Sequence, residues 1–199
     1  ASSGSALQLD GVDDYIAVTE SGSPSSLDLT GNQVSFSLWL KTSDDSGMIA
    51  LKSDSASATG VAYNLRISAG DLKLEVGNGS GYYRNCTADV GDGDWNHWVA
   101  TFTGSSFAFF KNGSAVSCTA SGSTGTLGAF KSITQDLVIG RFPAFGSYVG
   151  GQELEGSLDE LAIFSDALSS SEAAAIYNSG SYVSTLASNS GDYNSSGDL

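Results

Sequence analysis

The sequence predicts an all-β fold, an antiparallel two-sheet sandwich that carries one short helix near its C-terminal end. Three observations predict it. Apolar and polar residues alternate with a period of two along several segments, Gly, Ser and Asn separate these segments, and an Ala-rich segment follows the last of them. Short strands broken by such turns are typical of β sandwiches. With 199 residues, of which 40% are hydrophobic, the chain suits one large domain. We expect that domain over residues 1–185.

The expected strands follow one another along the chain. In QVSFSLWLK (33–41) every second residue from Val34 to Leu40 is apolar, which predicts one buried face, with Trp39 on the other. The same alternation marks YNLRIS (63–68) and DLKLEVGNG (71–79). Further strands are expected in WNHWVATF (95–102), SFAFFKNG (106–113), DLVIGRF (136–142) and GSLDELAIF (156–164). Within these, Asn112–Gly113 is the strongest hairpin signal in the chain.

The pattern changes after the last strand. DALSSSEAAAIYNSG (166–180) offers Ser169 or Ser170 as a helix cap, Glu172 in the first turn, three consecutive alanines and a stop near Gly180. This predicts one short helix. Residues 186–199 are expected to be a tail or a linker to a further region of a longer protein.

Charge limits the partners of the chain. Its formal net charge is −14, from 22 acidic and 8 basic residues. Such a chain repels nucleic acid and anionic membrane surfaces, and it attracts cations. No apolar stretch approaches the roughly 20 residues that a membrane helix needs, so no membrane insertion is expected. The start of the sequence shows no basic region followed by an apolar run, so no signal peptide is expected.

Of the two cysteines, Cys86 precedes the predicted strand that begins at Trp95, and Cys118 lies just after the predicted Asn112–Gly113 hairpin. They have no CxxC spacing, which argues against zinc. A disulfide between neighbouring strands is the favoured interpretation, and it would imply an oxidising compartment. Two buried thiols are the alternative.

Four stretches in a fixed order carry a family resemblance. They are ALQLDGVDDYIAV at the start, VSFSLWLKT next, GDWNHWVATFTGSSFAFFKNG in the middle and LEGSLDELAIFSDALSSSEAAAIYNSG at the end. This order resembles the laminin-G-like, concanavalin A-like lectin and glucanase jelly-roll domains, over about residues 6 to 180. The resemblance implies two antiparallel sheets packed face to face in a jelly roll. It also implies a recognition role toward glycans or proteins, as part of a larger secreted or surface protein.

An acidic cluster lies in LDGVDDYI near the start of the chain. Asp10, Asp13 and Asp14 could offer several oxygens to a calcium ion, and Gly11 permits a tight backbone. In the resembled family the first strand lies near the last one, so Asp159 of SLDEL is the expected distant ligand, with Ca²⁺ in a structural role. The alternative is a solvated polar turn in which the carboxylates accept hydrogen bonds from backbone amides.

Catalytic patterns fail on this sequence. Jelly-roll hydrolases place carboxylates in an E-x-D-x-x-E pattern, and in QELEGSLDEL Glu153 and Glu155 alternate but the central Asp is missing. The one histidine, His97, lies in WNHWVA, where a structural role in a core strand is expected. No G-x-S-x-G motif is present. We therefore expect no catalytic residues.

Two places offer aromatic side chains for sugar binding. GSGYYRN contributes Tyr82, Tyr83 and Arg84 after a turn. GRFPAFGSYVGGQ is a Gly-flanked loop with unusually many aromatic residues; its candidates are Arg141, Phe142, Phe145 and Tyr148. The alternative is that Phe142 and Phe145 close one end of the sandwich.

Together these features predict a non-catalytic carbohydrate-binding or adhesion module with a structural calcium ion. We expect it to act outside the cell, at a cell surface or on a virion surface, on a glycan or another surface ligand. Two alternatives remain open at this point: a protein–protein interaction or particle-assembly domain, and a divergent glycan-cleaving enzyme.

Overall fold

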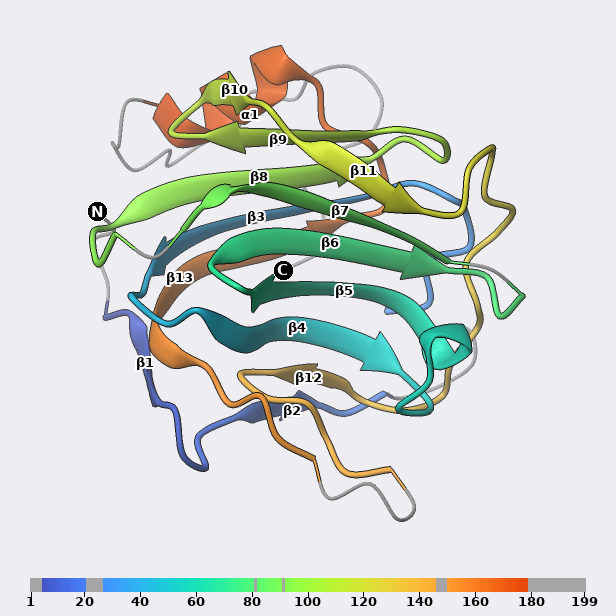
Figure 1. Ribbon diagram of the computed structural model, residues 1–199, viewed down its shortest axis with the longest axis horizontal. Helices are drawn as coiled ribbons and strands as arrows, with labels where there is room; N and C mark the ends of the chain where they lie inside the picture. Colours follow the sequence, from blue (N-terminus) through green and yellow to red (C-terminus); the bar gives the residue numbers. More distant parts are fainter. Residues whose placement is uncertain (1–4, 21–26, 81, 91, 146–149, 179–199) are drawn as a thin grey trace.

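Two antiparallel sheets packed face to face form the molecule, as the sequence predicts (Figure 1). The computed structural model describes residues 5–20, 27–80, 82–90, 92–145 and 150–178, with the backbone alone over 82–89. Sheet A has six strands in the order β1 (Leu7–Asp10), β13 (Glu155–Phe164), β3 (Val34–Lys41), β8 (Asn96–Phe102), β9 (Phe107–Lys111) and β10 (Ser114–Val116). Sheet B has seven strands in the order β11 (Thr119–Gly122), β7 (Tyr82–Asp89), β6 (Asp71–Gly77), β5 (Val61–Ser68), β4 (Ser46–Ser53), β12 (Leu137–Ile139) and β2 (Ile16–Val18).

The core lies between the sheets and uses the alternation seen in the sequence. Val34, Phe36 and Leu38 of β3 are completely buried. They meet Leu65 and Leu74 of sheet B in the same hydrophobic cluster. Interdigitating side chains of two twisted sheets fill such a core at close to crystalline density.

Strand β4 lies on no alternating segment of the sequence. All seven residues from Gly47 to Ser53 are buried, since the strand has neighbours on both sides and its two faces are both covered. Residues 48–51 are apolar throughout and Lys52 and Ser53 follow them, so the strand shows no period of two and periodicity alone does not reveal it. Met48 and Leu51 pack with Val61 in a second small cluster against Phe142.

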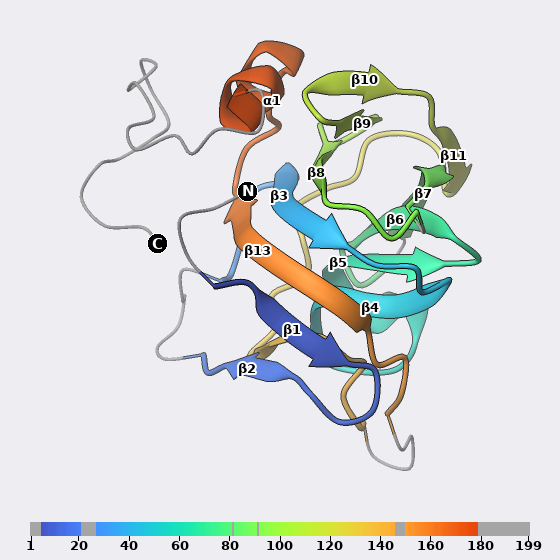
Figure 2. The same ribbon diagram turned by 90° about the vertical axis from the view of Figure 1, so that its left-hand side faces the viewer.

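The predicted helix, α1 (Ser170–Tyr177), covers part of the outer face of sheet A (Figure 2). Ser169 is its N-cap and forms a capping box with Glu172, and Asn178 ends it in a left-handed conformation. Ala173 packs with Val99 and Phe110 of the sheet.

The hairpin predicted at Asn112–Gly113 is present between β9 and β10. Both residues have positive φ, 51° and 74°, as a two-residue hairpin turn of this kind requires. A side chain at position 113 would also lie 2.9 Å from the Tyr177 ring of α1. Glycine at position 113 therefore permits both the backbone conformation of the turn and the close packing of α1.

Candidate functional site

The acidic turn joins β1 to β2 at one edge of the sandwich. Gly11 has φ of 73°, and a Cβ there would lie 2.9 Å from the Cβ of Glu155, so the turn requires glycine. Asp10 Oδ1 accepts a hydrogen bond from the Val12 amide at 2.8 Å. Asp14 Oδ2 accepts one from the Asp10 amide at 3.1 Å. These bonds explain two of the three carboxylates as supports of the turn.

The same carboxylates also form a group of oxygen donors. Asp10, Asp13 and Asp14 are exposed, and each offers an oxygen within 4.8 Å of those of the other two. Hard carboxylate oxygens are the donors that Ca²⁺ prefers. A set of three fits part of a calcium shell, and water and backbone carbonyls would have to supply the rest.

The prediction that Asp159 joins this group is wrong in its geometry. Strands β1 and β13 are neighbours, as expected, but the register pairs Asp10 with Glu155 and Leu7 with Leu158. Asp159 lies four residues along β13 from Glu155, which corresponds to about 13 Å. Its Oδ1 accepts the Glu160 amide instead, at 2.9 Å. The correct strands meet, but at the wrong residues.

The aromatic loop predicted at 141–148 begins directly beside the acidic turn. The guanidinium carbon of Arg141 lies 3.7 Å from the centre of the Tyr15 ring, a stacked cation–π arrangement. The Nε of Arg141 is buried without a hydrogen-bond partner, and none of the ion pairs among the described residues involves Arg141. Within the described part of the chain, the guanidinium therefore contacts an aromatic ring and no carboxylate.

Phe142 and Phe145 form an edge-to-face pair with ring centres 5.7 Å apart. Phe142 is anchored on Met48, Leu51 and Val61 of sheet B. Met48, Leu51 and Val61 form a cluster separate from the core between the sheets, so this packing leaves open whether the rings close one end of the sandwich. We refer to Tyr15, Arg141, Phe142 and Phe145, with the neighbouring acidic turn, as the rim.

Exposed apolar side chains gather at the rim. Among the described residues, the large hydrophobic side chains classed as exposed are Val12, Tyr15, Ile16 and Val18, with Val12 exposed to 70%. All four lie in the acidic turn or on β2, the edge strand of sheet B. A grouped apolar surface beside polar groups is typical of a binding site. Tyr15 was not among the residues predicted from the sequence, although its position directly after the acidic turn was a usable signal.

Other predicted site residues lie outside the described side chains. Tyr148 falls in the undescribed segment 146–149, and Tyr82, Tyr83 and Arg84 lie on β7, where the backbone alone is described. In sheet B, strands β6, β5 and β4 separate β7 from β12, so the two predicted ligand-binding places are at least about 19 Å apart.

The disulfide stays a prediction. The backbone of Cys86 on β7 is paired with Thr119, the residue after Cys118, so the two strands are neighbours as expected. The side chain of Cys86 lies outside the described residues. Titration of the denatured, unreduced protein with a thiol reagent decides the question, because a disulfide leaves neither cysteine reactive.

His97 has none of the geometry of a catalytic base. Its Nε2 lies 3.0 Å from Ser37 Oγ, but its Nδ1 is buried without a partner, so no carboxylate of the described residues orients the ring. Burial lowers the pKa of His97 to about 4. Trp39 and Tyr177 flank the ring, with centres 5.4 and 5.9 Å away. Glu155 is exposed at the start of β13, and Glu153 precedes the strand.

The structure has no described helix of the length and apolarity that a bilayer crossing demands. A search of the curated proteins found no match. Among solved structures, the fold is similar to a Ruminococcus gnavus IT-sialidase CBM40 bound to α2,3 sialyllactose, with 16% identity, a TM-score of 0.62, and 87% of this chain and 97% of that chain covered.

Two further structures are similar. One is domain 4 of AbnA, a GH43 extracellular arabinanase from Geobacillus stearothermophilus, in complex with arabinotriose, with 17% identity, a TM-score of 0.58, and 89% of this chain and 78% of that chain covered. The other is the LG1-3 region of the laminin α2 chain, with 16% identity, a TM-score of 0.59, and 78% of this chain covered. The present chain spans only 30% of the length of that laminin structure. These likenesses establish the fold.

The family model that matches the sequence covers residues 10–174, which is most of the chain, and it describes the concanavalin A-like lectin/glucanases superfamily. Its span includes the acidic turn, every strand after β1 and most of α1. The chain belongs to the concanavalin A-like lectin/glucanase superfamily.

Proposed function

We propose that the chain is a non-catalytic carbohydrate-binding or adhesion module that works outside the cell as part of a larger protein, and that the rim contacts the glycan. The observation that carries the proposal is the stack of Arg141 on Tyr15 beside the Phe142–Phe145 pair. Sugars combine flat C–H faces with hydroxyl groups, and the rim combines aromatic rings with guanidinium donors.

Tyr15 and Arg141 have different roles at the rim, because their side chains are exposed to different extents. Tyr15 is exposed to 46% and offers ring surface, while Arg141 is half-buried. The stack on Tyr15 limits the rotamers of Arg141, so less side-chain entropy is lost when a ligand is bound. Such a surface binds and orients a sugar without supplying a proton donor or acceptor tuned for bond cleavage.

We further propose that the acidic turn holds a calcium ion with a structural role. Asp13 is the carboxylate of the group that accepts no hydrogen bond within the described turn, which leaves it to the ion. Exposed carboxylates in an incomplete cage are typical of weak sites, with Kd of about 10⁻⁴ to 10⁻³ M, as in extracellular modules. An ion there would also offset the negative charge beside a glycan.

The similar structures support a glycan as the ligand. One of them is a carbohydrate-binding module with sialyllactose bound, and another is a domain of an arabinanase with arabinotriose bound. These ligands belong to those proteins, and their variety leaves open which sugar this chain binds.

A glycan array tests the proposal. The intact protein, with calcium present, is expected to bind a restricted set of glycans, and Tyr15→Ala and Arg141→Gln are each expected to weaken that binding at least about tenfold, the effect of 1.4 kcal/mol. Lys111→Gln, which removes one positive charge from β9, is the matched control for Arg141→Gln. Binding that survives both rim substitutions would refute the assignment of the rim. Release of new reducing ends from the glycans would show an enzyme instead.

A further inference from the structure

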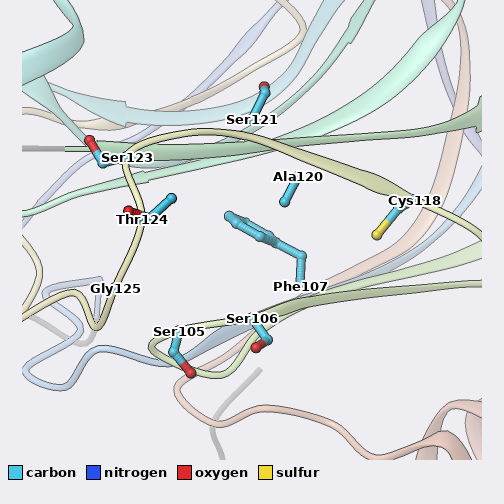
Figure 3. Close-up of a pocket in the computed structure, with 9 residues that line it drawn as sticks. All are labelled: Ser105, Ser106, Phe107, Cys118, Ala120, Ser121, Ser123, Thr124 and Gly125. Carbon is cyan, nitrogen blue, oxygen red and sulfur yellow. The ribbon is translucent and has the colours of Figure 1, made fainter.

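A pocket of about 300 Å³ opens at the other edge of the sandwich, away from the rim (Figure 3). One wall is the 105–107 segment at the start of β9, and the other is the end of β11 with the segment 123–125. Strand β11 and strand β2 are the two edge strands of sheet B, at opposite sides of Figure 1. Six strand spacings separate them, about 29 Å, so the pocket and the rim cannot contact one small ligand together.

The pocket has one aromatic ring at its centre, with hydroxyl-bearing residues and Cys118 around it. Phe107 extends into the middle of it toward Ala120, the small side chain on the opposite wall (Figure 3). The other lining residues are Cys118, Gly125, four serines and a threonine, namely Ser105, Ser106, Ser121, Ser123 and Thr124. Ser121 alternates with Ala120 on β11, so its side chain points away from the ring (Figure 3). Among the described residues that line the pocket, none carries a charge.

The frame around the pocket is built before a ligand arrives. Phe107 packs against Phe102 with ring centres 4.6 Å apart and the ring planes tilted by 42°, which supports the half-buried Phe107 ring. The turn before it is closed by the Thr103 amide donating to Ser106 O at 2.9 Å. The Leu127 amide donates to Gly104 O at 2.8 Å and ties the second wall to that turn. A prearranged site loses less entropy on binding.

The chemistry of the lining selects a class of ligand. Each hydroxyl can donate and accept a hydrogen bond, as the hydroxyl groups of a sugar also can. A ring in the middle offers a face for the C–H side of a sugar. Because no charge lines the walls, the pocket offers no group to pair with a carboxylate, a sulfate or a cation, although the chain as a whole has a net charge of −14. The volume lies at the lower end of ligand pockets and suits one or two sugar units.

We propose that this pocket is a second carbohydrate site, which takes a single neutral sugar unit on the face of Phe107. Two sites about 29 Å apart would let one domain hold a polysaccharide at two points, which raises the avidity for long chains above that for short ones. The site does not depend on the rim or on calcium.

The test uses the ¹⁵N-labelled protein and NMR titration. The probes are glucose, galactose, mannose and arabinose, each at about 50 mM, which suits the millimolar Kd expected of so small a ligand. Glucuronate is the charged comparison. At least one neutral sugar is expected to shift the amide signals of Phe107, Ser121 and Ser123, and glucuronate is not.

Two substitutions locate the binding. Ala120→Leu fills the space above the ring at an exposed position, so it is expected to leave the rest of the spectrum unchanged and to weaken sugar binding at least about tenfold. Ala115→Leu, at an exposed alanine of the neighbouring edge strand β10, is the matched control and is expected to bind as the original chain does. Phe145→Ala at the rim is also expected to leave these shifts in place.

Three results would overturn the proposal: no shift in the pocket with any neutral sugar, shifts that persist in Ala120→Leu, or equal binding of glucuronate. Shifts confined to rim residues would overturn the second site and leave the proposed function of the rim standing. Shifts in the pocket that persist in Phe145→Ala would support the second site independently of the rim.

Discussion

The burial of His97 makes the stability of this fold depend on pH. The ring is 2% exposed, and burial lowers the pKa from 6.5 to about 4. The unfolded chain therefore binds a proton between these two values and the folded chain does not. The stability that the neutral His97 contributes is therefore present above pH 6.5 and is lost as the pH falls toward 4.

The size of the loss follows from the two pKa values. A pKa difference of this size corresponds to about 2 kcal/mol at pH 5 and about 3 kcal/mol at pH 4. One effect opposes it. Trp39 and Tyr177 flank the ring, and cation–π attraction would favour the charged form by about 0.5 to 2 kcal/mol. Nδ1 has no acceptor, so desolvation remains the larger effect.

The assay is urea unfolding of the original chain and of His97→Gln at several pH values from 7 to 4. Carboxylates also titrate in this range, and hydrogen bonds from Ser169 lower the pKa of Glu172. Because both proteins retain these groups, the difference between their unfolding free energies isolates His97. At pH 7 the variant is expected to be less stable, since it loses the ring contacts.

The deficit of the variant is expected to shrink by about 3 kcal/mol between pH 7 and pH 4. Parallel stability curves for the two proteins would refute the reasoning, because they would mean that His97 titrates alike in the folded and unfolded chains. A histidine NMR titration with an apparent pKa near 6.5 in the folded protein would refute it as well.

Three further predictions concern single contacts. Calcium is expected to raise the melting temperature and a chelator to lower it, and Asp13→Asn should remove this response without unfolding the protein; a melt indifferent to both would leave the acidic turn merely solvated. Lys52 is 1% exposed and paired with Glu20, so Glu20→Gln should lower the unfolding free energy by about 3 to 5 kcal/mol in denaturant. The double variant Lys52→Met with Glu20→Leu should lose less stability than the sum of the losses in Lys52→Met and Glu20→Leu alone, and additive losses would contradict the pairing. Ser169→Ala should remove the capping box and cost about 1 kcal/mol, with Ser170→Ala as the control, and equal costs would contradict the cap.

Local patterns in the sequence were enough to predict much of the fold. Three of these patterns depend only on residues close together in the sequence: the alternation from Val34 to Leu40, the Asn112–Gly113 turn and the Ser169–Glu172 cap. Such features follow from backbone geometry and from the period of the side chains, whatever lies around them. The order of four motifs added the family, because each of them alone is weak.

The tertiary structure alone decided which distant residues meet. Asp159 lies on the expected neighbouring strand, yet the register moves it about 13 Å from the acidic turn, since a strand advances by roughly 3.3 Å with each residue. Tyr15 and Arg141 form a stack because β2 pairs with β12. The pocket at Phe107 exists because the turn before β9 faces the end of β11. Pairing and register depend on the packing of the whole chain, and no local pattern carries that information.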